Sequence, residues 1–202
     1  MKAVVITLLG AVCLSACTAK TDRGDTLAAG SASGMAVGAT SSAMATPAPV
    51  QLSDANVVEK LSSGDSAEIA LGKLVQTKAT DAGVRQFGTL LVTDHGANAK
   101  QVASLAKKDS LTPQPPPSDT SAAEHQHVLD RFKAMAKGKD FDTAFVNHAV
   151  EDHQKEISDL QSAQGSLQNA ELKALVEKTL PVMQKHLDRA KALQAKLSGT
   201  KS

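Results

Sequence analysis

Beyond residue 50, apolar residues recur every three or four positions, which is the spacing of one face of an α-helix. No stretch after that point alternates strictly between apolar and polar residues, as a half-buried strand would. Turn and capping residues divide the pattern into five segments. The expected helices cover about residues 54–78, 82–108, 118–137, 141–164 and 170–197.

Residues that favour helix ends lie at these boundaries. The candidate N-caps are Ser53 or Asp54, Thr80 or Asp81, and Asp140. The proline run 115–117 excludes helix between the second and third segments and requires an extended connection. The other turns are short, so consecutive helices should be antiparallel neighbours. The pattern therefore predicts an all-α, up-down helical bundle with one longer crossover.

Each of the five apolar faces contains one residue that can bind a metal ion. These residues are Glu68, His95, His125, His153 and His186. Burying ionisable groups without partners costs several kcal/mol. Mutual hydrogen bonds or a shared metal ion would remove that cost, and helical bundles build metal centres from inward carboxylates and histidines. We therefore expect these residues either to bind a metal or to form a hydrogen-bonded polar layer.

Distances along the helices indicate which of these side chains can meet. Glu68 and His95 lie at similar distances from the turn that joins their helices, and so do His125 and His153. His186 fits less well, because it lies about 8 Å off the level of His153 at the usual helical rise. Two further histidines, at positions 127 and 148, lie off the apolar faces and are expected to be solvated.

Several polar residues flank the predicted site. Glu156 lies three residues after His153, so both share a helix face and Glu156 joins the candidate metal ligands. Asn98 occupies the matching place in the second helix. Asp94 and Asp152 directly precede histidines. Each is expected to be a ligand or a partner that fixes an imidazole tautomer, with a helix cap or an ion-pair partner as the alternative.

Three segments carry a resemblance to a known family. They are residues 68–74, the two Val-x-Asp-His segments at 92–95 and 150–153, and residues 179–187. Together they resemble an exported bacterial family of ferritin-like helical bundles that has no assigned function and whose members are often labelled putative outer-membrane proteins. The resemblance covers about residues 55–193. It implies a ferritin-like four-helix bundle with an additional short helix, and leaves the activity open.

The chain departs from the di-iron sites of ferritin-like proteins. Those sites pair single glutamates with Glu-x-x-His segments, whereas here the order is His153-x-x-Glu156 and Asn98 replaces a carboxylate in the earlier copy. A site with many imidazoles and few carboxylates suits zinc, copper or a single iron better than a di-iron pair. We therefore expect a transition metal, if one binds, without ferroxidase activity.

The first fifty residues have the pattern of an export signal and a tether. Lys2, the apolar residues 3–12 and the segment 14–17 (Leu-Ser-Ala-Cys) match a signal peptide over residues 1–16. Segment 14–17 resembles a bacterial lipobox, which implies that Cys17 is lipidated; an ordinary signal peptide is the alternative. Thr18 rather than Asp after the cysteine implies the periplasmic side of the outer membrane. Residues 17–50 then form a flexible tether, and residues 51–202 form one domain.

The composition and motifs of the chain narrow the classes of function that it can have. The chain carries 22 basic and 21 acidic residues and lacks Trp and Tyr, so it has no basic, aromatic surface for nucleic acid. The sequence shows no nucleophile elbow, HExxH motif or phosphate loop, which favours a protein that is not an enzyme. Two hypotheses follow: a lipid-anchored envelope protein that binds a transition metal in a stress or metal-handling role, and a structural or interaction module of the envelope with no metal. No protein partner is indicated beyond the membrane.

Overall fold

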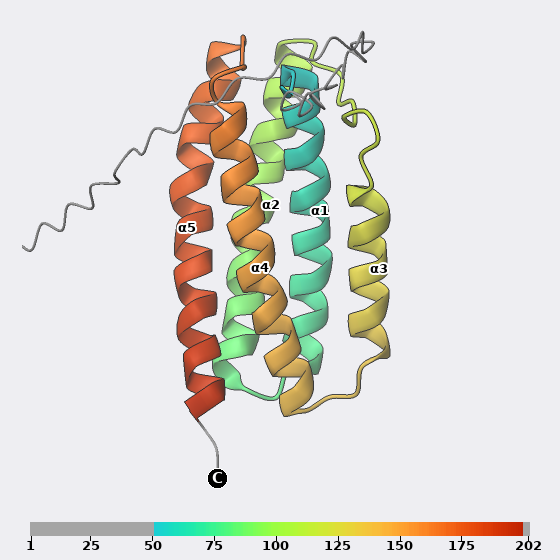
Figure 1. Cartoon of the computed structure of the whole chain (residues 1–202), viewed down its shortest axis with the longest axis vertical. Helices are drawn as coiled ribbons and strands as arrows, with labels where there is room; N and C mark the ends of the chain where they lie inside the picture. The colour runs from blue at the N-terminus through green and yellow to red at the C-terminus, as the bar shows by residue number, and fades with distance from the viewer. Residues whose placement is uncertain (1–50, 200–202) are drawn as a thin grey trace, which may run out of the picture. The chain divides into compact units, whose positions relative to one another are not determined.

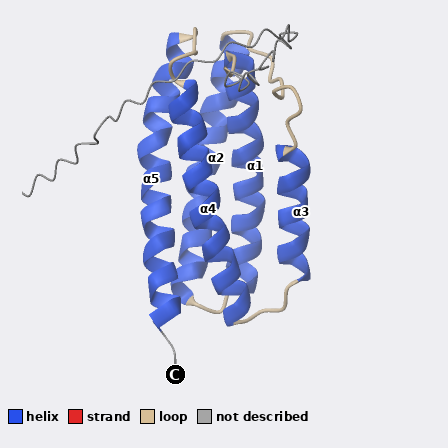
Figure 2. Cartoon of the chain, in the orientation of Figure 1, coloured by secondary structure: helices blue, strands red, loops and turns tan. Residues whose placement is uncertain are grey.

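The computed structural model describes residues 51–199, and this part of the chain contains five α-helices and no strand (Figure 2). The helices are α1 (Asp54–Lys78), α2 (Ala82–Lys108), α3 (Ser121–Ala134), α4 (Lys139–Ala163) and α5 (Ala170–Gly199). The prediction of an all-α protein is confirmed. The predictions for the signal peptide, for Cys17 and for the tether fall on residues outside the described part.

The helices form a bundle in which α1, α2, α4 and α5 run side by side (Figure 1). The most extensive packing joins α1 to α2 and α4 to α5, and α2 also packs against α5. The shorter α3 lies outside these four, against α1. Within residues 51–199, every helix is too short or too polar to serve as a membrane span.

Capping side chains define where the first two helices begin. Ser53 and Asn56 form a reciprocal capping box at the start of α1, and Asp81 accepts hydrogen bonds from two backbone amides at the start of α2. The predicted cap at Asp140 is wrong. The chain turns at Gly138, whose φ of 148° favours glycine, and α4 begins at Lys139, so Asp140 lies inside the first turn. There its negative charge interacts favourably with the positive end of the helix dipole.

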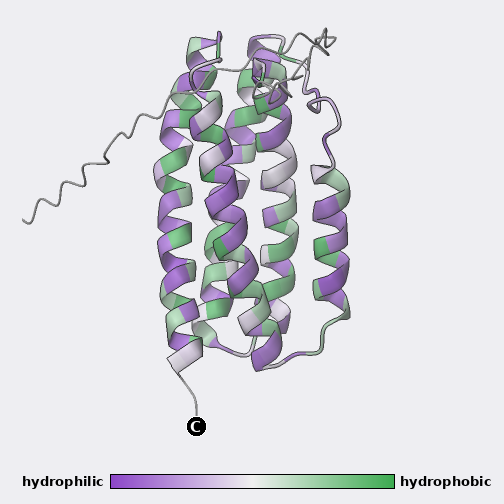
Figure 3. Ribbon diagram, in the orientation of Figure 1, coloured by the Kyte–Doolittle hydropathy of each residue, from purple (hydrophilic) through white to green (hydrophobic). Residues whose placement is uncertain are grey.

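The core is formed by the apolar face of each helix (Figure 3). All four phenylalanines of the chain are completely or almost completely buried; they are Phe87, Phe132, Phe141 and Phe145. Burying a side chain of this size contributes about 2–3 kcal/mol. Phe132 is the buried residue of α3, and its ring lies 5.8 Å from the ring of Phe141, so α3 is attached to α4 through this contact.

Two glycines set how closely α1 and α2 approach. A Cβ atom on Gly72 would lie 2.8 Å from the carbonyl oxygen of Gly88, and one on Gly88 would lie 2.9 Å from the carbonyl oxygen of Gly72. Glycine is therefore required at both positions for the backbones to pack this closely. This contact also fixes the register of the two helices, which places the polar residues of α1 beside those of α2.

Candidate metal centre

Three histidines from three helices meet inside the bundle. His95 of α2, His153 of α4 and His186 of α5 are 5%, 0% and 1% exposed, and we call them the histidine cluster. Each offers one ring nitrogen, and the three nitrogens lie within 4.8 Å of one another. His186 thus reaches the other two, although its position along the chain predicted an offset. The turn over residues 164–169 need not join two helix ends at the same height.

An oxygen acceptor binds one ring nitrogen of each histidine. Carboxylate and carbonyl oxygens only accept hydrogen bonds, so the nitrogen facing each of them carries the proton. The three contacts are His95 Nδ1 to Asp65 Oδ1 at 2.8 Å, His153 Nδ1 to the carbonyl oxygen of Ala149 at 3.0 Å, and His186 Nε2 to Asp94 Oδ2 at 2.9 Å.

The second nitrogen of each neutral ring is therefore unprotonated. His153 Nε2 lies 3.3 Å from His186 Nδ1, so two acceptors face each other without a proton between them. His95 Nε2 is buried and has no hydrogen-bond partner. Nitrogens bound to one tetrahedral zinc ion at about 2.05 Å would lie about 3.3 Å apart, which matches this separation. The histidine cluster could hold a metal ion.

Burial keeps the imidazoles of His153 and His186 neutral. Desolvation, with smaller effects from His95 and His186, lowers the pKa of His153 to about 3. Desolvation also lowers the pKa of His186, against the opposing influence of the Asp94 carboxylate. The neutral imidazole is the form that binds metal ions, so both rings are in the binding form throughout the physiological pH range.

Two carboxylates lie next to the histidine cluster. Glu68 of α1 and Asp152 of α4 each offer an oxygen that, together with a ring nitrogen of His153, forms a second group within 4.8 Å. Glu68 is 3% exposed, and its Oε2 has no hydrogen-bond partner. Desolvation, followed by the charges of Asp152 and Glu156, raises the pKa of Glu68 well above its usual value. A cation beside Glu68 would supply the missing positive charge, so this carboxylate is placed to act as a further ligand.

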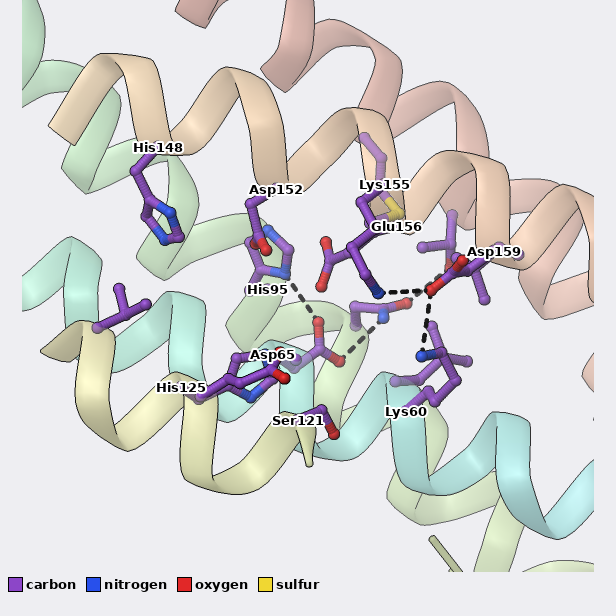
Figure 4. Close-up of a pocket in the computed structure, with 18 residues that line it drawn as sticks. Lys60, Asp65, His95, Ser121, His125, His148, Asp152, Lys155, Glu156 and Asp159 are labelled. Carbon is purple, nitrogen blue, oxygen red and sulfur yellow. Dashed lines mark hydrogen bonds and ion pairs between the residues drawn. The ribbon is translucent and has the colours of Figure 1, made fainter. Parts of the chain in front are cut away.

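Glu156 lies in a cavity that borders the cluster. This cavity, of about 170 Å³, lies beneath α3 between α1 and α4, and His95 and Asp65 form part of its lining; we call it the α3 cavity. Figure 4 shows the carboxyl groups of Asp65, Asp152 and Glu156 pointing toward one another across it. Glu156 Oε2 has no hydrogen-bond partner, and desolvation together with these two neighbouring carboxylates raises the pKa of Glu156.

His125 does not join the histidine cluster. It lies half-buried on α3, where its Nδ1 is 3.4 Å from the hydroxyl oxygen of Ser63. The described residues contain two groups that could hold a metal, and neither includes His125 or Glu156. His127 is exposed, as predicted. The prediction that His148 is solvated is wrong. Its side chain is half-buried with its ring 5.6 Å from the ring of Phe132, and burial lowers its pKa.

The flanking polar residues connect the helices around the site. Asp94 binds His186 on α5 rather than its neighbour in the chain. Asn98 donates to Asp65 Oδ2 at 2.9 Å and accepts from the Thr179 hydroxyl at 2.9 Å, which joins α1, α2 and α5. Asp65 is the residue that the hydrophobic pattern does not predict. Its position three residues before Glu68, on the same helix face, is the signal that could have identified it.

Comparison with known proteins adds one relationship. Neither the curated proteins nor the solved structures gave a match. The sequence profile of one protein family matches residues 39–193, which includes α1, α2 and α4 and the part of α5 that carries His186. On this match the chain belongs to the family described as "Domain of unknown function (DUF4142)".

Proposed function

We propose that this protein binds a transition-metal ion through His95, His153 and His186, as a lipid-anchored envelope protein with a stress or metal-handling role. In this proposal α1, α2, α4 and α5 are a ferritin-like, up-down four-helix bundle and α3 is the additional short helix. The anchor is Cys17, which places the domain at the periplasmic side of the outer membrane. The observation that carries the metal site is that an oxygen acceptor lies within hydrogen-bond distance of one ring nitrogen of each of the three imidazoles.

All three outward nitrogens are hydrogen-bonded, and all three inward nitrogens are left with lone pairs in a buried space. A carboxylate or carbonyl behind each imidazole is the arrangement that orients histidine ligands in metalloproteins. A buried polar atom without a partner costs about 1–3 kcal/mol, so a group of such atoms is unfavourable unless a cation binds them. Metal binding thus accounts for the unpaired His95 Nε2 and for the facing nitrogens of His153 and His186.

The donor set limits the identity of the ion. Three imidazoles with an adjacent carboxylate and no thiolate suit zinc, copper or a single iron. Calcium and magnesium prefer oxygen ligands, which are the minority here. Glu68 or Asp152 supplies the fourth ligand, since each has an oxygen close to His153.

A structural module without metal is the second candidate. The hydrogen bonds from Asp65 through Asn98 to Thr179 connect three helices and need no ion. A fully bonded polar network of this kind specifies how helices pack. This alternative predicts that the histidines stabilise the fold and bind nothing.

Metal titration separates the two candidates. Purified protein without a histidine tag, treated with chelator and titrated with Co²⁺ or Zn²⁺, is expected to bind one ion per chain, with the Co²⁺ absorption bands of a tetrahedral site. His95→Gln and His153→Gln should each weaken binding by about 100-fold or more, because each removes a ligand. His127→Gln, an exposed change on α3, is the matched control and should bind as the unaltered protein does. Absence of binding by zinc, copper, iron and cobalt at micromolar concentration would refute the metal proposal and favour the structural module.

A further inference from the structure

The α3 cavity joins the surface to the histidine cluster. Its lining includes the exposed residues Glu124 and Lys155 as well as the buried residues His95 and Asp65. His95 is 5% exposed, and its Nε2 is one of the atoms without a hydrogen-bond partner. One continuous space therefore runs from solvent to the side chain of His95, a member of the histidine cluster.

The charges along this space favour a cation. Five acidic side chains line the α3 cavity, against two lysines. Both lysines bind the same carboxylate, since Lys60 Nζ and Lys155 Nζ lie 3.2 and 2.9 Å from Asp159 Oδ2. The other four acidic groups form no ion pair with either lysine. Desolvation and the charges of Asp152 and Asp65 raise the pKa of Glu156 by more than Lys60 and Lys155 lower it. A cleft with one excess sign of charge concentrates ions of the opposite sign.

Glu156 lines this space, and its carboxyl group points toward those of Asp65 and Asp152 (Figure 4). Its Oε2 is unpaired, and Gly64 of α1 faces its other oxygen. A Cβ atom on Gly64 would lie 2.8 Å from Glu156 Oε1. Glycine weakens the interior of a helix, and here it leaves room for the carboxylate. The two residues together hold an unpaired oxygen in the middle of the cavity.

The way in which α3 is attached indicates that the entrance of the α3 cavity lies at the N-terminal half of α3. The C-terminal end of α3 is held by the buried Phe132 and by Lys78, whose Nζ donates to the carbonyl oxygens of Phe132 and Lys133 at 2.9 and 2.7 Å. The N-terminal half carries Glu124 and His125, which line the α3 cavity. A cation would therefore enter past the N-terminal half, opposite the anchored end.

We propose that the α3 cavity is the route by which a divalent transition-metal cation reaches the histidine cluster, and that Glu156 binds the cation on the way. This inference rests on the proposed metal-binding function and adds the path of loading to it. Glu156 acts as a transient ligand, so it governs how fast the ion arrives and leaves rather than how tightly it is finally held.

Rapid-mixing kinetics with Co²⁺ alone test the route in the full-length protein. Glu156→Gln removes the carboxyl group as a ligand, and Gly64→Ala displaces that group while favouring the helix. Both should slow association and dissociation by about tenfold or more and leave the dissociation constant within about threefold. Glu177→Gln, an exposed change on α5, and Gly96→Ala, which meets no atom within 4 Å, are the matched controls and should change neither rate. Circular dichroism checks that each variant is folded.

The possible results have separate meanings. Unchanged association rates in both Glu156→Gln and Gly64→Ala would overturn the route while the metal centre itself stands. A dissociation constant that rises more than about tenfold, with association unchanged, would make Glu156 a ligand of the bound ion and would also overturn the transient role. No Co²⁺ binding by the unaltered protein would instead refute the proposed function on which the route rests.

Discussion

At the scale of single residues, the site depends on where three protons lie. One nitrogen of each imidazole of the histidine cluster faces an oxygen outside the cluster, so in the neutral rings the lone pairs belong to the other nitrogens. Two of the acceptors differ in burial, since the side chain of Asp65 is 4% exposed and that of Asp94 is 32% exposed. A buried carboxylate is less screened by water, so Asp65 orients its histidine more firmly than Asp94 does.

The lowered pKa of His153 predicts how the metal-free protein responds to acid. In the unfolded chain His153 takes up a proton as the pH falls through about 6.5, whereas in the folded protein its pKa is about 3. The unfolded state then binds more protons, so stability is full above pH 6.5 and falls as the pH decreases, by about 2 kcal/mol at pH 5. Urea unfolding at pH 7 and pH 5 measures this loss.

A variant isolates the contribution of this one residue. His153→Gln should remove about 2 kcal/mol of the difference between the two pH values, because glutamine does not titrate. Comparison with the variant is needed because Glu68 has the opposite effect on the pH dependence of stability. Its raised pKa makes the stability fall as the pH rises above the usual carboxyl range. An equal pH dependence in the variant and the unaltered protein would show that His153 is not held neutral in the fold.

At the scale of helices, the contact between α1 and α2 is the feature most sensitive to small changes. Gly88→Ala would place a methyl group 2.9 Å from the backbone oxygen of Gly72 and 3.0 Å from a side-chain carbon of Val75, and backbone cannot move aside cheaply. We expect a loss of about 1–3 kcal/mol in the free energy of unfolding, measured by chemical denaturation. Gly96→Ala on the same helix meets nothing within 4 Å and should stabilise by up to about 1 kcal/mol. Equal stability of the two variants would contradict this packing.

The helices themselves were predictable because periodicity is a local property. The start of α1 after Ser53 and of α2 after Asp81 follows from capping chemistry within a few residues. The third helix was predicted over about residues 118–137 but covers Ser121–Ala134. Ser118 has a φ of 61°, which is outside the helical region, and the backbone after Ala134 is extended at Met135.

Contacts between helices were less predictable, because they depend on rotation and register. The pattern along each helix identified Glu68, His95, His153 and His186 as inward, and all four are buried. It could not show that Asp65 would meet His95, since that pair depends on how α1 and α2 are aligned at Gly72 and Gly88. His125 was placed on an apolar face, but α3 packs outside the four other helices, so this face does not reach the cluster.

At the scale of the whole molecule, the candidate centre lies where four helices meet and α3 does not. The histidine cluster takes one residue from each of α2, α4 and α5, and Glu68 adds α1. An ion bound there would connect helices that are distant in the chain. Unfolding of any one of the four would break a metal–ligand bond, so binding should oppose local opening in each of them.

Hydrogen exchange with and without Zn²⁺ tests this arrangement. Saturation at about 100 times the dissociation constant should stabilise the fold by about 2.7 kcal/mol and slow exchange of the most protected amides in α1, α2, α4 and α5. Amides of α3 should change little, because α3 supplies no atom to either candidate metal group and can detach from α1 while the ion stays bound. His186→Gln should weaken binding by about 100-fold, as expected for the loss of a ligand, so at the same Zn²⁺ concentration most of the protection should be lost in all four helices together. Protection confined to one helix, or equal protection of α3, would place the ion somewhere other than at the histidine cluster.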